Sequence, residues 1–229
     1  MKKLKILLII PIALISVYVL LSMFCYYTGA LKLYNNTTNA NEPNLELNSK
    51  LYISSWITPK NGDFVGYNFE DHISGKHTRI HRLIAKEYDT LQIINGNVYV
   101  NNQNIDNTLN LIHAYLISKD VYLNIKNSEN IGDDHIAYST DNDLVYTFLD
   151  KIIAKKYHLE SARQISSINE MDHVIYDTYK NNWNKDNFGP LVIPKDQAFV
   201  LGDNRDNSED SRYTGLIHSS NITGVLLNH

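Results

Sequence analysis

The chain is poor in cysteine and proline and carries no excess of basic residues. Its 229 residues include one cysteine, Cys25, and five prolines. A single thiol excludes an internal disulfide and the multi-cysteine kind of zinc site. The formal net charge of −4 offers no basic patch, so we expect no nucleic-acid partner. With 43% hydrophobic residues, the chain is long enough for one globular domain with a core of its own.

A long uncharged run follows three lysines at the start of the chain. It spans 26 residues, Ile6 to Leu31, which as a helix exceeds the ~30 Å of a bilayer's hydrocarbon core. A cleaved secretory signal has a shorter apolar region of ~7–15 residues and a small-x-small cleavage site. We therefore predict that residues 1–31 are an uncleaved, single-pass anchor in the cytoplasmic membrane. The basic residues favour an N-terminus in the cytoplasm, which leaves residues 32–229 extracytoplasmic.

Alternating apolar residues indicate a β-rich body. Strands are expected at Leu51–Trp56, Phe64–Phe69 and Thr78–Ile84, and Asn95-Gly96 suits the two-residue turn of a hairpin within Thr90–Val100. Ile222–Leu227 has the pattern of a closing strand.

The middle of the chain, residues 104–190, is polar and mixed, and we interpret it as an α/β insertion that covers one edge of the sheet. Within it, Leu144, Phe148 and Ile152 fall on one stripe, which predicts a helix over Asp143–Lys156. No motif with chemistry is found in this segment. The predicted fold class is mainly β with an α/β insertion.

The most informative stretch is the polar run from Leu201 to Gly215. Its composition is typical of a solvated loop. Arg205 and Ser208 stand where a calcium loop needs a ligand and a glycine, and the aromatic and β-branched residues on both sides argue against disorder. The run is also compatible with a polar network beside an active site. If the segment is extended, Asp210 and Arg212 share a face and can pair, and Ser208 can offer a hydroxyl to a catalytic base.

The same run resembles the signal peptidase I family, whose diagnostic motif is G-D-N-R-D-N-S-x-D-S-R-x-x-G. The chain matches every fixed position of that motif. The resemblance implies a membrane-anchored serine endopeptidase fold: a signal peptidase I-like β-fold behind a single transmembrane helix, with no cofactor. It implies signal peptides of exported preproteins as partners, held as an added strand over an apolar floor with two shallow pockets. It also implies a supporting network of Ser208, Asp210 and Arg212.

Two positions depart from the family. The register set by Glu42-Pro43-x-Leu45 places Ala40 where the family has its nucleophilic serine, and alanine has no oxygen to attack a carbonyl. Thr37 and Thr38 are the nearest hydroxyls. His81 stands where the family has its general base, a lysine, and a histidine with an ordinary pKa of ~6.5 can serve as a base without a large shift. His77 shares the strand face of His81, yet no carboxylate stands at a ligand spacing, so we expect no metal.

These observations support three functions. The first is a signal peptidase I-like membrane protein that binds signal peptides, with cleavage absent or heavily reduced because of Ala40. The second is an active serine-type signal peptidase that uses another hydroxyl, with His81 as its base. The third is a membrane-tethered β domain without enzymatic activity.

Overall fold

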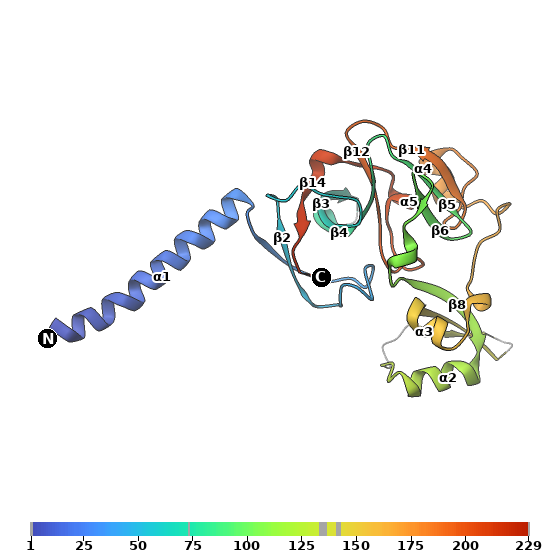
Figure 1. Ribbon diagram of the computed structural model, residues 1–229, viewed down its shortest axis with the longest axis horizontal. Coiled ribbons are helices and arrows are strands. Elements are labelled where there is room, and N and C mark those ends of the chain that lie inside the picture. The colour runs from blue at the N-terminus through green and yellow to red at the C-terminus, as the bar shows by residue number, and fades with distance from the viewer. Residues whose placement is uncertain (1, 73, 133–136, 141–142, 229) are drawn as a thin grey trace.

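The computed structural model describes residues 2–72, 74–132, 137–140 and 143–228, which form a long helix followed by a β-rich body (Figure 1). The body has two antiparallel sheets that share a core, and a third sheet in a smaller appended unit. Its mainly β architecture confirms the fold class predicted from the sequence.

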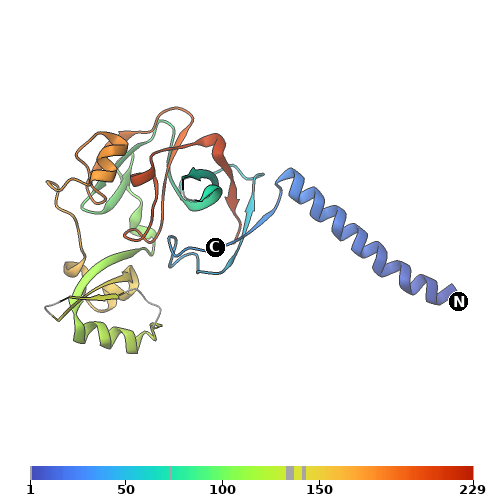
Figure 2. The same cartoon turned by 180° about the vertical axis from the view of Figure 1, so that it is seen from behind.

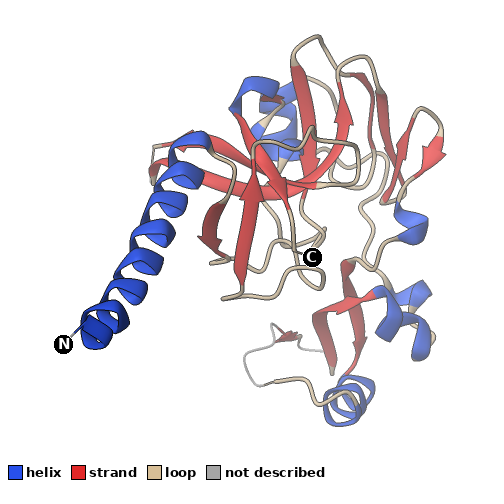
Figure 3. Ribbon diagram, turned by 60° about the vertical axis from the view of Figure 1, so that its left-hand side comes forward, coloured by secondary structure: helices blue, strands red, loops and turns tan. Residues whose placement is uncertain are grey.

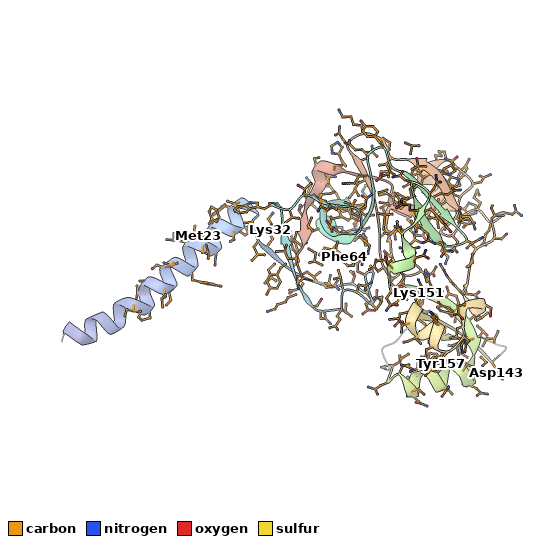
Figure 4. All side chains as sticks on the ribbon, in the orientation of Figure 1. Met23, Lys32, Phe64, Asp143, Lys151 and Tyr157 are labelled. Carbon is orange, nitrogen blue, oxygen red and sulfur yellow. The ribbon has the colours of Figure 1, made fainter. Side chains whose placement is uncertain are left out.

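Helix α1 (Lys2–Thr28) extends away from the body, as Figures 1 and 2 show. Its segment Ile10–Thr28 has a mean hydropathy of 2.0 and is long and apolar enough to cross a membrane. Nearly all side chains of this segment are exposed, and Figure 4 shows them, with Met23 labelled, projecting where no other element packs. An apolar surface of this extent needs a lipid or protein partner.

The end of α1 is attached to the body by two contacts. The ring of Phe24 lies edge-on to Trp56, with centroids 6.1 Å apart, and the backbone N–H of Ser55 donates to the carbonyl of Gly29 at 3.0 Å. Gly29 has a φ of +71°, and a Cβ there would lie 2.6 Å from Ser55 Oγ. The close approach of helix end and body therefore requires glycine.

Seven strands form the first sheet, in the order β1-β2-β14-β3-β4-β12-β13. Side chains alternate between more and less buried along β1 and the second half of β3, whereas Phe64–Tyr67 of β3 and Ala198–Leu201 of β12 are buried on both faces. The strands are β1 (Lys32–Asn35), β2 (Lys50–Ser54), β3 (Phe64–Asp71), β4 (Gly75–Lys86), β12 (Gln197–Leu201), β13 (Ile217–His218) and β14 (Ile222–Leu226).

Strand β4 is longer than β12, its neighbour on one side, so part of the β4 edge on that side is open. β3 pairs with β4 from Gly75 to Arg82, whereas β12 pairs with it only from Arg82 to Lys86. In the part of the chain that the structure describes, no second strand pairs with residues 75–81. This stretch is an open β-edge inside the sheet, in addition to the outer edges of the terminal strands β1 and β13.

The second sheet has the order β11-β5-β6-β7 and packs its apolar face, with two short helices, against β12. Its hairpin turns at Asn95 and Gly96, both with positive φ, which confirms the predicted Asn-Gly turn. Phe188 lies at the centre of this core, against Trp183 and Phe199. The elements are β5 (Thr90–Ile94), β6 (Asn97–Val100), β7 (Gln103–Asn104), β11 (Phe188–Val192), α4 (His173–Tyr179) and α5 (Ser211–Thr214).

The appended unit lies between β7 and β11 in the chain, and Figures 1 and 3 show it set apart from the two larger sheets. It has a small core of its own around Ile125 and Leu149. We expected this insertion to cover a sheet edge; instead it joins the loop after β12, where Ile112 N donates to Asp203 O and Arg205 N donates to Ile112 O. Its elements are η1 (Asp106–Thr108), β8 (Ile112–Ser118), α2 (Lys119–Ser128), β9 (Ala137–Ser139), β10 (Leu144–Asp150), α3 (Lys151–Lys156) and η2 (Glu160–Ala162).

The helix predicted over Asp143–Lys156 is wrong in its first half. β10 pairs with β8 along its whole length and buries Val145, Thr147 and Leu149 in alternation. Asp150 then caps α3 by accepting from two backbone N–H groups at 2.8 and 2.9 Å. The same apolar positions also fit one face of a helix. The segment is a strand because it pairs with β8, which is distant in the sequence.

Substitutions at Leu149 and Ile152 test this correction. The Leu149 side chain is 2% exposed and that of Ile152 is 66% exposed. Leu149→Ala should therefore lower the free energy of unfolding by about 2–4 kcal/mol, since it leaves a cavity, and Ile152→Ala should change it by less than about 0.5 kcal/mol. Both values can be measured by denaturant unfolding of the full chain in detergent. If Ile152 were part of a buried helical stripe, Ile152→Ala would instead lower the free energy of unfolding substantially.

Candidate functional site

The polar loop after β12 is built on a buried ion pair. Asp210 accepts from Arg212 Nε at 2.9 Å and from its Nη2 at 2.8 Å, and it also accepts from Gly202 N at 3.1 Å. Burial would raise the pKa of the Asp210 carboxyl, but the charge and hydrogen bonds of Arg212 outweigh it and lower that pKa. The predicted pairing is present, although the segment is not extended: Asp210 instead caps the short helix α5.

Two further buried pairs fix the loop to other elements. Arg82, on β4, binds both carboxylate oxygens of Asp203 at 2.8 and 2.6 Å. Arg205 binds both oxygens of Asp106, at the start of η1, at 2.7 and 2.6 Å. Bidentate geometry of this kind restricts direction as well as distance. The loop is therefore held rigidly against β4, which carries His81.

His81 is buried beside this loop with both ring nitrogens occupied. Its Nδ1 lies 2.9 Å from the hydroxyl of Tyr67, on β3, and its Nε2 lies 3.3 Å from Ser208 Oγ. Burial lowers the pKa of His81 to about 4, although the nearby Asp210 charge works to raise it. The imidazole is consequently neutral at pH 7 and able to accept a proton.

Ala40 lies beside the loop after β12, on the segment between β1 and β2. Its carbonyl accepts from Asn204 N at 3.0 Å, and a Cβ at Gly202 would lie 2.4 Å from that carbonyl oxygen and 2.2 Å from Ser208 Oγ. Next to it, Asn41 Nδ2 donates to the carbonyl of Ile80 at 2.6 Å. The five residues singled out from the sequence, Ala40, His81, Ser208, Asp210 and Arg212, therefore gather around one point.

A cleft of about 350 Å³ opens beside this point. One wall is the segment from Asn35 to Ala40, and the other is the open edge of β4 from His77 to His81, so that Ala40 and His81 both line the cleft. Ser208 does not line it. We expected an apolar floor, but Ala40 and Ile80 are the apolar lining residues, and the others are Asn35, Asn36, Thr37, Thr38, Asn39, His77, Thr78, Arg79, His81, Asn207 and Glu209.

A hydroxyl group close to the His81 ring distinguishes the predicted functions. Within the part of the chain that the structure describes, the hydroxyls that contact the His81 ring belong to Tyr67 and Ser208. Thr37 and Thr38 line the cleft without such a contact. The described residues contain no group of three or more His, Cys, Asp or Glu side chains placed to hold a metal ion. His77 instead accepts from Arg79 Nε at 3.2 Å.

Several functional contacts were missed from the sequence. The contact of Tyr67 with His81 depends on how β3 is aligned with β4, with Val65 opposite His81. This alignment cannot be deduced from the sequence of one strand. Arg82–Asp203 and Asp106–Arg205 join residues about a hundred positions apart, so no local pattern reveals them. The charged residues of the polar run were the one feature of the sequence that indicated ion pairs in this loop.

Comparisons with known proteins agree on one family. A family model described as signal peptidase, peptidase S26, matches residues 5–227. The signal peptidase I of Buchnera aphidicola subsp. Baizongia pistaciae is 26% identical over 182 residues, which cover 74% of this chain and 54% of that protein. Signal peptidase I P of Bacillus subtilis subsp. natto is 56% identical over 39 residues, or 17% of this chain and 21% of that protein. The chain thus spans about half the length of the first of these relatives, and less of the second.

Among solved structures, a signal peptidase I from Enterococcus faecalis V583 aligns with 75% of this chain and 98% of its own. Its sequence identity is 17% and its TM-score is 0.35.

The two buried histidines near this loop predict a pH-dependent stability. His113, on β8 and next to Asp206, also has its pKa lowered to about 4 by burial. A histidine whose pKa is lower in the folded chain binds fewer protons there than in the unfolded chain, so acidification favours unfolding. Between pH 6.5 and 4 each histidine should remove on the order of 2–3 kcal/mol from the free energy of unfolding.

Denaturant unfolding at a series of pH values measures this effect. His81→Gln and His113→Gln should each flatten the pH dependence by about half, whereas His173→Gln, at an exposed position, should leave it unchanged. Some pH dependence should remain near pH 4, because the lowered pKa values of Asp206 and Asp210 also make the folded chain less stable on acidification. A pH dependence that is undiminished in the double variant would contradict the assignment.

Proposed function

Because the chain belongs to the signal peptidase family, peptidase S26, we propose that it binds signal peptides of exported preproteins in the cleft beside His81. The observation that carries the proposal is the open edge of β4 over residues 75–81, which forms one wall of the cleft. Asn41 Nδ2 already donates to the carbonyl of Ile80 on this edge. An extended peptide can add along the rest of it as a further strand, because its backbone then pairs with the N–H and C=O groups there.

The anchor fits this role. Lys2, Lys3 and Lys5 precede the apolar segment Ile10–Thr28 of α1, which favours a cytoplasmic N-terminus and an extracytoplasmic body in the cytoplasmic membrane. Since α1 ends at Thr28 and the cleft segment begins at Asn35, the chain between them keeps the cleft tethered close to the bilayer. A signal peptide leaving the membrane would meet the cleft there.

Cleavage by this site is absent or heavily reduced, because the nucleophile position carries the methyl group of Ala40. Ser208 and Tyr67 hold the ring of His81, which is neutral at pH 7, but its lowered pKa of about 4 makes it a weak base. A general base without a nucleophile gives little peptide cleavage, since removal of the catalytic serine from a serine peptidase such as subtilisin lowers the turnover number by ~10⁶. The protein is accordingly a binding relative of the peptidases.

A second candidate function, an active serine peptidase, is favoured by the 3.3 Å contact between Ser208 Oγ and His81 Nε2. A nucleophile and base at this distance can form a catalytic pair. Against it, Ser208 does not line the cleft, and its hydroxyl lies so close to Gly202 that a Cβ there would be 2.2 Å away. Little room remains around Ser208 for a tetrahedral adduct, so we assign its hydroxyl to positioning the imidazole. A third candidate, a tethered β domain without a ligand, predicts that no peptide binds.

Ala40→Ser tests the missing nucleophile. The wild-type chain in detergent should cleave a preprotein at background rate, and Ala40→Ser should raise the rate at least ~10-fold, because it returns an oxygen to the position next to a neutral imidazole. Ala40→Ser combined with His81→Gln should lose that gain. Robust wild-type cleavage would refute the binding role, and Thr38→Ala and Ser208→Ala would then identify the hydroxyl responsible.

A fluorophosphonate probe separates the candidate nucleophiles directly, because it reacts covalently with activated hydroxyls. We expect no adduct on the wild-type chain and an adduct at position 40 in Ala40→Ser, both located by peptide mass spectrometry. A wild-type adduct on Ser208 would establish the second candidate function. Tryptophan fluorescence of each variant checks that the fold is retained.

A further inference from the structure

The open edge of β4 places one charged pair in the cleft. The side chain of Arg79, on β4, is 17% exposed, and that of Glu209, on the loop after β12, is 66% exposed. Arg79 Nη2 lies 3.0 Å from Glu209 Oε2. The pair lies two residues along β4 from His81, on the same face of the strand. A peptide added along this edge would pass directly beside it.

The charge of Arg79 is already compensated by its neighbours. Its Nε donates to His77 Nε2 at 3.2 Å, its Nη1 donates to the backbone carbonyl of Glu209 at 3.3 Å, and its Nη2 also lies 3.6 Å from Asp71 Oδ2. The guanidinium stacks on the Phe69 ring at 3.8 Å. All three of its nitrogens therefore have partners, and little of this cation is available to an incoming anion.

Glu209, in contrast, presents a carboxylate to the cleft. Two carboxylates, Asp71 and Glu209, surround the single guanidinium of Arg79 and leave an excess of one negative charge with the histidines counted as neutral. Residues 32–229 add to this field, because they carry 18 basic and 25 acidic side chains. Glu209 is thus the lining group best placed to bind a cation.

The rest of the lining also disfavours a small apolar side chain. Thr37, Thr38 and Asn39 line the opposite wall with hydroxyl and amide groups that are at least partly exposed. Covering such groups with a methyl group removes water without replacing its hydrogen bonds. A side chain with donors of its own avoids that cost.

We propose that the cleft selects a peptide with a lysine or arginine side chain at the position that faces Glu209, and rejects an acidic one there. This specificity rests on the peptide-binding function proposed above and departs from the small side chains that the family resemblance implies. Because side chains of an added strand alternate in direction, one position should respond and its two neighbours should not.

The test uses fluorescence anisotropy of labelled peptides on the full chain in detergent. One polar parent peptide with alanine at three successive positions is compared with variants that carry lysine or glutamate at each of them. At one position, lysine should bind about two- to fivefold tighter than alanine, and glutamate weaker than alanine, the upper range of an exposed ion pair. The preference should shrink as the salt concentration rises.

Substitutions of Glu209 assign the preference to its carboxylate. Glu209→Gln should abolish the lysine preference, and Glu209→Lys should reverse it toward glutamate. Glu170→Gln, an exposed position in the segment between the appended unit and α4, is the matched control and should leave both affinities unchanged.

The outcomes that would contradict the proposal are distinct. If no peptide binds at any position, both the proposed function and this specificity are wrong. If alanine and lysine peptides bind equally, or if the lysine preference persists in Glu209→Gln, peptide binding stands and the specificity is overturned. Tighter binding of glutamate peptides to the wild-type chain would show instead that Arg79 is the recognising group.

Discussion

Three buried carboxylate–guanidinium pairs hold the loop after β12, and the site depends on them. Asp203–Arg82, Arg205–Asp106 and Asp210–Arg212 each join the loop to a different neighbour: β4, η1 and α5. Every one of these side chains is at most 8% exposed. Because breaking such a pair leaves an uncompensated buried charge, each partner fixes the other. The result is a loop whose backbone positions Ser208 against His81 and whose Asn204 N–H binds the carbonyl of Ala40.

The same network sets the electrostatics around His81. Burial removes water from the imidazole and lowers its pKa, and the charge of Asp210, which would raise that pKa, is opposed by the charges of Arg79 and Arg212. A lysine at this position would require strong desolvation to lose its proton, whereas a histidine with an ordinary pKa near ~6.5 needs none. The surroundings therefore favour a neutral imidazole held by Tyr67 and Ser208, whether or not a nucleophile faces it.

Much of the fold was predictable from local patterns, and the site only in part. Alternation predicted β2, β3, β4 and β14, and Asn95-Gly96 predicted a hairpin, because these signals lie within a few residues. The strand β10 was mistaken for a helix, since its apolar positions fit both periods and its partner β8 is distant in sequence. Asp210–Arg212 was predictable because the residues are two apart. Tyr67 beside His81, and the polar lining of the cleft, depend on strand register and on packing between distant segments.

The buried pairs also explain why the polar run by itself is no sign of catalysis. Loss of one charged partner from such a pair costs about 3–5 kcal/mol, a large part of a typical domain's stability. Asp203, Asp210 and Arg212 are therefore required by the fold, whatever chemistry the site performs. Ala40 is different, because it is only partly buried and its anchoring contact is made by its backbone carbonyl, which any residue supplies. A side-chain oxygen at position 40 can thus be lost without cost to the loop, while the charged motif must persist. In this chain the motif reports the architecture, whereas the proposed loss of cleavage rests on position 40.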